Sequence, residues 1–212
     1  MTRSRTRTGT RSRTRIRAAL VAAVATALLA APGIGTAEAV PSPDHHCVFE
    51  GIDLNAFLGV SERLIGPPPC REAFVGERWV RTLPGWGTAT GPDGAVYPAG
   101  YTPSRPAPMD DFLAKLQGVR IVQDIGTRQE WSVTVGPEIV RRVDTVDDQI
   151  IANFASHPLR PLSAGPHTST VFMRLSAEHC DGLGDNPDDH CLPAGEFQYT
   201  GNTPVTFFPR RR

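Results

Sequence analysis

The chain has 212 residues, with 22 Lys and Arg, 22 Asp and Glu, and four cysteines. Residues 1–39 hold seven of the basic residues and one of the acidic residues, which leaves 15 basic and 21 acidic residues in the remainder. This net charge near −6 argues against a nucleic-acid partner, because phosphates are bound by basic surfaces. The remainder, about 170 residues, is enough for one domain with its own core.

The N-terminal region has the pattern of a secretory signal peptide. Arginine-rich residues 1–17 precede an apolar run over 18–31, which is shorter than the roughly 20 residues that span a bilayer. The sequence Ala-Glu-Ala at 37–39 predicts cleavage before Val40. We therefore expect a secreted, extracellular protein with a flexible N-terminal tail over 40–46 and no membrane anchor.

Four cysteines follow the predicted cleavage site: Cys47, Cys70, Cys180 and Cys191. An even number of cysteines in an exported chain favours disulfides over free thiols or a zinc site. Four cysteines allow three connectivities. We expect the pairing that is local in sequence, Cys47–Cys70 and Cys180–Cys191.

The first part of the predicted domain, residues 47–108, is tethered by its disulfide. Asp53 or Asn55 is a candidate cap for one short helix. Residues 77–83 alternate between polar and apolar side chains, which predicts a strand. Residues 84–108 are rich in Gly and Pro and predict a surface loop excursion, because prolines prevent long regular elements.

The second part, residues 109–209, is expected to supply the core strands. A short helical turn over 110–116 comes first, and 147–154 fits either a strand or a helical turn. β-Branched segments divided by Gly and Pro predict strands at 119–122, 130–135, 139–146, 168–177, 195–199 and 204–208. Together these segments favour a mainly β domain over 47–209, an antiparallel immunoglobulin-like β-sandwich with one or two short helices.

An acidic loop over 181–189 lies inside the second predicted disulfide. Its oxygen ligands suit Ca²⁺, and residues 181–186 resemble a piece of the calcium-binding type-three thrombospondin repeat. The alternative is a turn that uses Asp, Asn, Gly and Pro for its geometry, and we expect this turn. His179 and His190 are expected on the exposed face of the adjoining hairpin. The weak calcium candidates are Asp181, Asp185, Asp188 and Asp189.

Three aromatic residues of the loop excursion, Trp86, Tyr97 and Tyr101, are candidate ligand-binding residues. Exposed aromatic rings on a loop can stack on a sugar or contact a protein. The alternative, which we expect, is that they fold back over the edge of the domain. Trp79 and Trp131 are expected in the core.

Catalytic sequence motifs are missing: the sequence has no Gly-x-Ser-x-Gly, no His-Glu-x-x-His and no phosphate-binding loop. We expect a monomeric, non-catalytic extracellular binding or interaction module without a cofactor, whose partner is an extracellular protein or a carbohydrate. Two alternatives stay open. One is a secreted hydrolase, because a Ser-His-Asp triad is recognised by geometry and not by sequence order. The other is a protease inhibitor that uses residues 66–71 as its bait.

Overall fold

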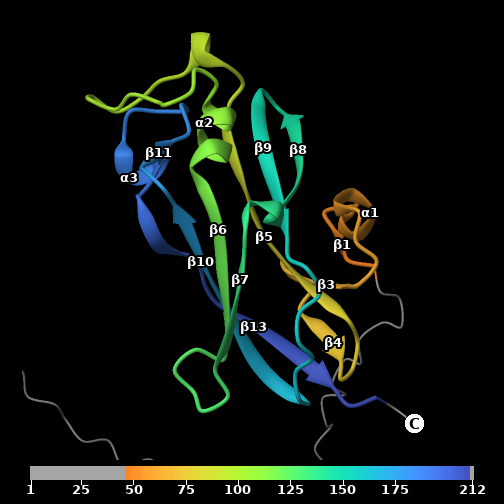
Figure 1. Cartoon of the computed structure of the whole chain (residues 1–212). Helices are drawn as coiled ribbons and strands as arrows, with labels where there is room; N and C mark the ends of the chain where they lie inside the picture. The colour runs from red at the N-terminus through yellow and green to blue at the C-terminus, as the bar shows by residue number, and fades with distance from the viewer. Residues whose placement is uncertain (1–45, 211–212) are drawn as a thin grey trace, which may run out of the picture. The chain divides into compact units, whose positions relative to one another are not determined.

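The computed structural model describes residues 46–210, and the chain in this range is mainly β. The predicted signal peptide, its cleavage site and nearly all of the predicted tail lie outside these residues. Most strands belong to two sheets (Figure 1). In chain order these strands are β3 (Arg63–Ile65), β4 (Glu72–Phe74), β5 (Trp79–Ala89), β6 (Leu116–Gln123), β7 (Trp131–Val135), β8 (Val140–Val146), β9 (Gln149–Ala155), β10 (Gly165–Leu175) and β13 (Gly195–Phe208).

The first sheet has five strands in the order β4-β13-β10-β6-β7, and the second has four in the order β3-β5-β9-β8. Most neighbours are antiparallel, as predicted. The prediction is wrong for two pairs, because β13 runs parallel to β4 and β3 runs parallel to β5. In both pairs a short strand from 63–74 adds to one of the long strands.

Short elements complete the domain. The N-terminal segment contains one two-stranded ribbon and one helix, a second ribbon and a short helix lie around the second disulfide, and a third helix directly precedes β6. These elements are β1 (Val48–Phe49), β2 (Ile52–Asp53), α1 (Leu54–Leu58), α2 (Pro108–Lys115), β11 (His179–Cys180), α3 (Pro187–His190) and β12 (Cys191–Leu192), with 3-10 turns at Pro92–Gly94 and Pro137–Ile139.

Helix α1 begins at Asp53, one of its two predicted caps, and ends at Gly59, earlier than the Gly-Pro-rich turn that begins at Gly66. Oδ1 of Asp53 accepts a hydrogen bond from the Ala56 amide at 3.1 Å, which satisfies one of the free amides of the first turn. Gly59 ends the helix in the left-handed conformation with φ of 64°, where a glycine has no side chain to clash.

The two sheets share one core. The rings of Trp79 from β5 and Phe207 from β13 meet edge to face with centroids 5.6 Å apart. Trp79 is fully buried, as predicted, whereas Trp131 is only half-buried because β7 is the edge strand of its sheet.

The loop excursion begins later than predicted, because β5 continues through Pro84 and Gly85 to Ala89. The register between β5 and β9 shifts between Leu83 and Trp86. Pro84 therefore lies in an irregularity of the ladder, where its missing N–H breaks no regular hydrogen bond. Trp86 consequently belongs to a strand and not to the loop.

The segment 147–154, which fitted either a strand or a helical turn, is a tight hairpin turn followed by the strand β9. Asp147 and Asp148 connect β8 to β9, and both have positive φ, 44° and 62°. Positive φ at both central residues is the geometry of a hairpin turn that matches the twist of its strands, and Asp tolerates it better than most residues. The two predicted closing strands, 195–199 and 204–208, form one irregular strand, β13.

Candidate functional site

A cavity of about 540 Å³ lies where the N-terminal segment, residues 47–58, meets residues of both sheets. This volume is in the range of small-molecule pockets. Its apolar walls include Phe49, Leu54, Phe57, Leu58, Leu83 and Pro84, and its polar side chains are Arg71, Arg81, Thr82, Asn153, Thr200 and Thr203. We refer to it below as the Arg71–Arg81 cavity.

The predicted disulfide between Cys47 and Cys70 is present and holds two walls of this cavity together. Cys47 begins the N-terminal segment, and Cys70 ends the turn whose Pro67 and Pro68 line the opposite side. The buried side chain of Asn55 adds a second link, because its Oδ1 accepts from the Cys47 amide at 2.8 Å. The N-terminal segment is thus fixed above the cavity.

The N-terminal segment also covers the outer face of β5 (Figure 1). Val80 packs in a second, small core with Leu58, Leu64 and Cys47, while its neighbour Trp79 faces the main core. All five residues from Trp79 to Leu83 are therefore buried. The alternation in this strand separates two buried faces, and not a buried face from an exposed one.

Arg81 places a positive charge inside the protein, and no carboxylate among residues 46–210 forms an ion pair with it. Only 3% of its surface is exposed. Its Nη1 donates to the carbonyl oxygens of Ile65 at 3.2 Å and Thr82 at 2.7 Å. Its Nη2 donates to Oγ1 of Thr203 at 3.0 Å, which links β5 to β13. All these acceptors are neutral, and Nε has no acceptor among the described residues.

Two further polar atoms, both on residues that line the cavity, are buried without a hydrogen-bond partner among the described residues. They are Nε of Arg71 and Oγ1 of Thr200. Neither Arg71 nor Arg81 forms an ion pair within 46–210. Burial first, and the nearby charge of Arg71 second, lower the pKa of Arg81 to about 10. Three of the buried polar atoms without a partner in the described range therefore belong to residues that line this cavity.

The three aromatic candidates do not form an exposed ligand platform. Trp86, Tyr97 and Tyr101 are all half-buried, and none of them lines the Arg71–Arg81 cavity. Trp86 contacts the rings of Phe112 and His179, with centroids 6.4 and 6.1 Å away. Tyr97 and Tyr101 contact one another at 5.2 Å. The expectation that they fold back over the domain agrees with this geometry.

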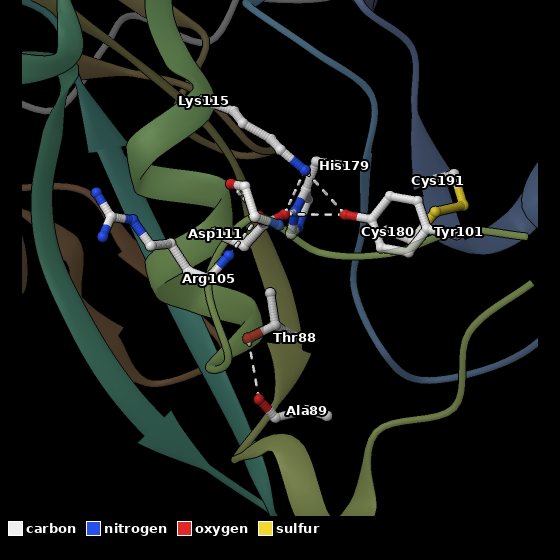
Figure 2. A network of polar contacts seen from close by, with 10 residues as sticks. Thr88, Ala89, Tyr101, Arg105, Asp111, Lys115, His179, Cys180 and Cys191 are labelled. Atoms are coloured by element: carbon white, nitrogen blue, oxygen red, sulfur yellow. Dashed lines mark hydrogen bonds and ion pairs between the residues drawn. A yellow bond between two sulfur atoms is a disulfide. The ribbon is translucent and has the colours of Figure 1, made fainter.

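Asp111 of α2 is the centre of a buried polar network that the sequence did not reveal (Figure 2). Figure 2 shows Lys115, His179 and Tyr101 converging on its carboxylate beside the Cys180–Cys191 disulfide. The network fixes the loop excursion and the β11–β12 ribbon to α2. The donors are Lys115 Nζ at 2.6 Å, His179 Nδ1 at 2.9 Å, Tyr101 OH at 2.9 Å, Ser104 N and Oγ at 2.6 and 2.7 Å, and Arg105 N at 3.2 Å.

This network determines the charge of its members. Burial opposes ionisation of Asp111, but hydrogen bonds from Lys115, His179, Ser104 and Tyr101 outweigh burial and hold its pKa below the usual range. Burial lowers the pKa of His179, and its bond to Asp111 only partly offsets this effect. His179 is fully buried, so the prediction of an exposed histidine at this position is wrong. His190 remains part-exposed and contacts Asp181 at 3.2 Å.

The acidic loop is organised by its own hydrogen bonds. Asp181 is buried and accepts from the Leu183 amide at 2.8 Å, while Asp185, Asp188 and Asp189 are exposed. Among the described residues, one group of three potential metal-ligating side chains clusters, and it contains Glu178, Cys180 and Cys191. The two cysteines of that group form the second predicted disulfide, so their sulfur atoms are not available as thiolates. The four aspartates do not converge on one point.

His167 lies between Ser163 and Asp124, which is the spatial arrangement of a Ser-His-Asp triad. Nε2 of His167 lies 3.4 Å from the Ser163 hydroxyl, and Nδ1 lies 2.7 Å from Oδ2 of Asp124. Nε2 is closer, at 3.0 Å, to the Ser163 carbonyl oxygen, which can only accept. Nε2 must carry a proton to donate to that carbonyl oxygen. A protonated Nε2 cannot accept the proton of the Ser163 hydroxyl. None of the three residues lines the Arg71–Arg81 cavity.

No helix among the described residues has the length and apolar character needed to cross a bilayer. Comparison of the chain with protein-family models, curated proteins and solved structures gives no significant match.

Proposed function

We propose that the chain is a secreted, monomeric, non-catalytic binding module with an immunoglobulin-like architecture, and that it holds a small organic ligand in the Arg71–Arg81 cavity. The carrying observation is that apolar walls and two arginines, Arg71 and Arg81, which form no ion pair among the described residues, occur together at this cavity. A ligand with acceptor groups can receive hydrogen bonds from the guanidinium groups of these arginines. The two disulfides support export to an oxidising compartment.

The cavity favours a small molecule over the extracellular protein or carbohydrate partner expected from the sequence. A protein partner contacts a broad surface patch, whereas this site is concave and partly covered by the N-terminal segment. Its apolar walls suit hydrocarbon better than the hydroxyl groups of a sugar. The aromatic residues that suggested sugar stacking are folded back against the domain.

A neutral, environment-sensitive dye such as Nile red tests the proposed function. We expect saturable fluorescence enhancement with one dye per chain. Thr200→Phe fills the cavity and should weaken dye binding by about tenfold or more. Thr206→Phe is the matched control, because Thr206 belongs to the same strand and does not line the cavity. Absence of saturable binding, or equal effects of the two substitutions, would contradict the proposal.

The secreted hydrolase is the second candidate, and the contacts among Ser163, His167 and Asp124 are the observation that favours it. A fluorophosphonate probe reacts with activated serines. We expect no labelling, because Nε2 of His167 faces the Ser163 carbonyl oxygen. Stoichiometric labelling that Ser163→Ala abolishes would support the hydrolase instead.

The protease-inhibitor alternative receives less support from the geometry of residues 66–71. This segment is a closed turn, in which the Gly66 amide donates to the Cys70 carbonyl at 2.8 Å and the Cys70 amide donates to the Pro67 carbonyl at 2.7 Å. A protease reads an extended segment whose backbone groups are free to pair. Titration against trypsin-like and subtilisin-like proteases tests this alternative directly, and we expect no inhibition.

A further inference from the structure

The charges of the Arg71–Arg81 cavity specify the ligand further, and this inference rests on the proposed function. We infer that the ligand is an amphiphile with an oxyanion head, a carboxylate or a phosphate, and an apolar body. The head is bound by the guanidinium groups of Arg71 and Arg81, and the body lies against the apolar walls.

No Asp or Glu among the described residues lines the cavity, although two arginines do. A guanidinium has five N–H donors. Those of Arg81 make three hydrogen bonds in the described range, all to neutral oxygens. A buried cation without a counter-ion is unfavourable, so the cavity is complementary to an anion.

Arg71 is close enough to Arg81 to contribute to the lowering of its pKa, so the two cations repel one another in the chain by itself. An anion in contact with both converts this repulsion into two attractions. The planar donor fork of arginine matches the oxygens of carboxylates and phosphates, and it forms stronger hydrogen bonds to them than to neutral acceptors.

Phe49, Leu54 and Phe57 project from the N-terminal segment, and Leu83 and Pro84 from β5 complete the apolar lining. An inorganic anion would leave this lining in contact with water. A neutral hydrocarbon would leave the two guanidinium groups without a counter-ion. Only a molecule with both parts satisfies the whole cavity.

The experiment compares four ligands of equal chain length below their micelle-forming concentrations: decanoate, decyl phosphate, decanol and decyltrimethylammonium. Binding is measured by displacement of Nile red and by the shift in melting temperature. We expect at least one of the two anions to bind about tenfold or more tightly than decanol, because charge-assisted bonds are stronger than neutral ones. The cation should bind most weakly. The comparison of decanoate with decyl phosphate identifies the head group.

Two substitutions assign the head to its residues. Arg71→Gln should weaken anion binding by about tenfold and leave decanol binding unchanged. Arg78→Gln is the matched control, because it removes the same charge from a side chain that is 77% exposed and outside the cavity. Arg81→Lys keeps the charge but loses the fork, and it provides a second test if Arg71→Gln fails to fold.

The outcomes separate the inference from the proposed function. Saturable Nile red binding with equal affinities for decanoate, decyl phosphate and decanol would overturn the oxyanion head and leave the binding function intact. Equal loss of affinity in Arg71→Gln and Arg78→Gln would also overturn it. Absence of binding by the dye and by all four ligands would overturn both.

Discussion

Nδ1 of His179 lies 2.9 Å from Oδ2 of Asp111, and both side chains are fully buried. This contact joins α2 to the β11–β12 ribbon across 68 positions of the sequence. Nζ of Lys115 lies 2.6 Å from the same carboxylate oxygen, and its positive charge balances the negative charge of Asp111. A buried carboxylate, a buried ammonium and a buried imidazole thus stabilise one another, and removing one of them leaves the others without compensation.

Asp111→Asn should therefore lower the free energy of unfolding by about 3–5 kcal/mol, because it leaves the charge of Lys115 buried and unpaired. Urea unfolding followed by tryptophan fluorescence measures this loss. Asp110→Asn is the matched control, since Asp110 is the exposed neighbour on the same helix turn, and it should change the stability by less than about 1 kcal/mol. Equal effects of the two substitutions would show that the network contributes little.

The network also predicts how stability depends on pH. Burial lowers the pKa of His179 in the folded state, so the unfolded chain binds more protons and acid favours unfolding. The contribution of His179 to the free energy of unfolding is complete above 6.5, the pKa of this histidine in the unfolded chain. It is lost as the pH falls below that value. The lowered pKa of Asp111 adds a second loss of stability as the pH falls below 3.8.

The free energy of unfolding should accordingly decrease between about pH 7 and about pH 5, the range in which an unfolded histidine titrates. His179→Gln should flatten this dependence, whereas His157→Gln, at a side chain that is 58% exposed, should retain the wild-type slope. A wild-type slope in His179→Gln would contradict the assignment.

The two disulfides should have separable effects. Replacing Cys47 and Cys70 by serine should reduce stability by about 2–4 kcal/mol and also weaken ligand binding, because the bridge holds the N-terminal segment over the cavity. Replacing Cys180 and Cys191 should reduce stability by a similar amount and leave binding unchanged in the fraction that folds. The two double variants serve as controls for one another, and identical binding in both would exclude this role of the first bridge.

Calcium should leave the melting temperature unchanged. The buried Asp181 already accepts from Leu183 and contacts His190, and the other aspartates of the loop point to solvent. At a Ca²⁺ concentration ten times the dissociation constant, a real site would add about 1.4 kcal/mol to the free energy of unfolding. The melting temperature would then rise by a few degrees. Melts with millimolar Ca²⁺ and with chelator provide the test. A calcium-dependent rise that Asp185→Asn abolishes would require a metal site in this loop.

Local signals in the sequence predicted much of the fold. The disulfide pairing follows from sequence proximity, the start of α1 from the capping side chain of Asp53, and most strands from β-branched runs between turn residues. The parallel positions of β3 and β4 were missed because three-residue strands carry almost no periodic signal.

The candidate site was missed for a different reason. Alternation correctly puts Arg81 on the same face of β5 as Trp79, but alternation contains no information about what that face meets. The approach of Arg71 and the bond to Thr203, 122 positions away, depend on how the sheets and the N-terminal segment come together. Long-range contacts of this kind are set by tertiary packing, which no local pattern encodes.

The most direct measurement of the binding proposal is a crystal structure of the protein with bromodecanoate, whose bromine atom is located by its anomalous scattering. We predict bromine density inside the Arg71–Arg81 cavity, near Phe49, Leu54 or Phe57, with the carboxylate within hydrogen-bonding distance of Arg71 or Arg81. Bromine density only outside this cavity, or none in crystals soaked at saturating concentration, would contradict the proposal.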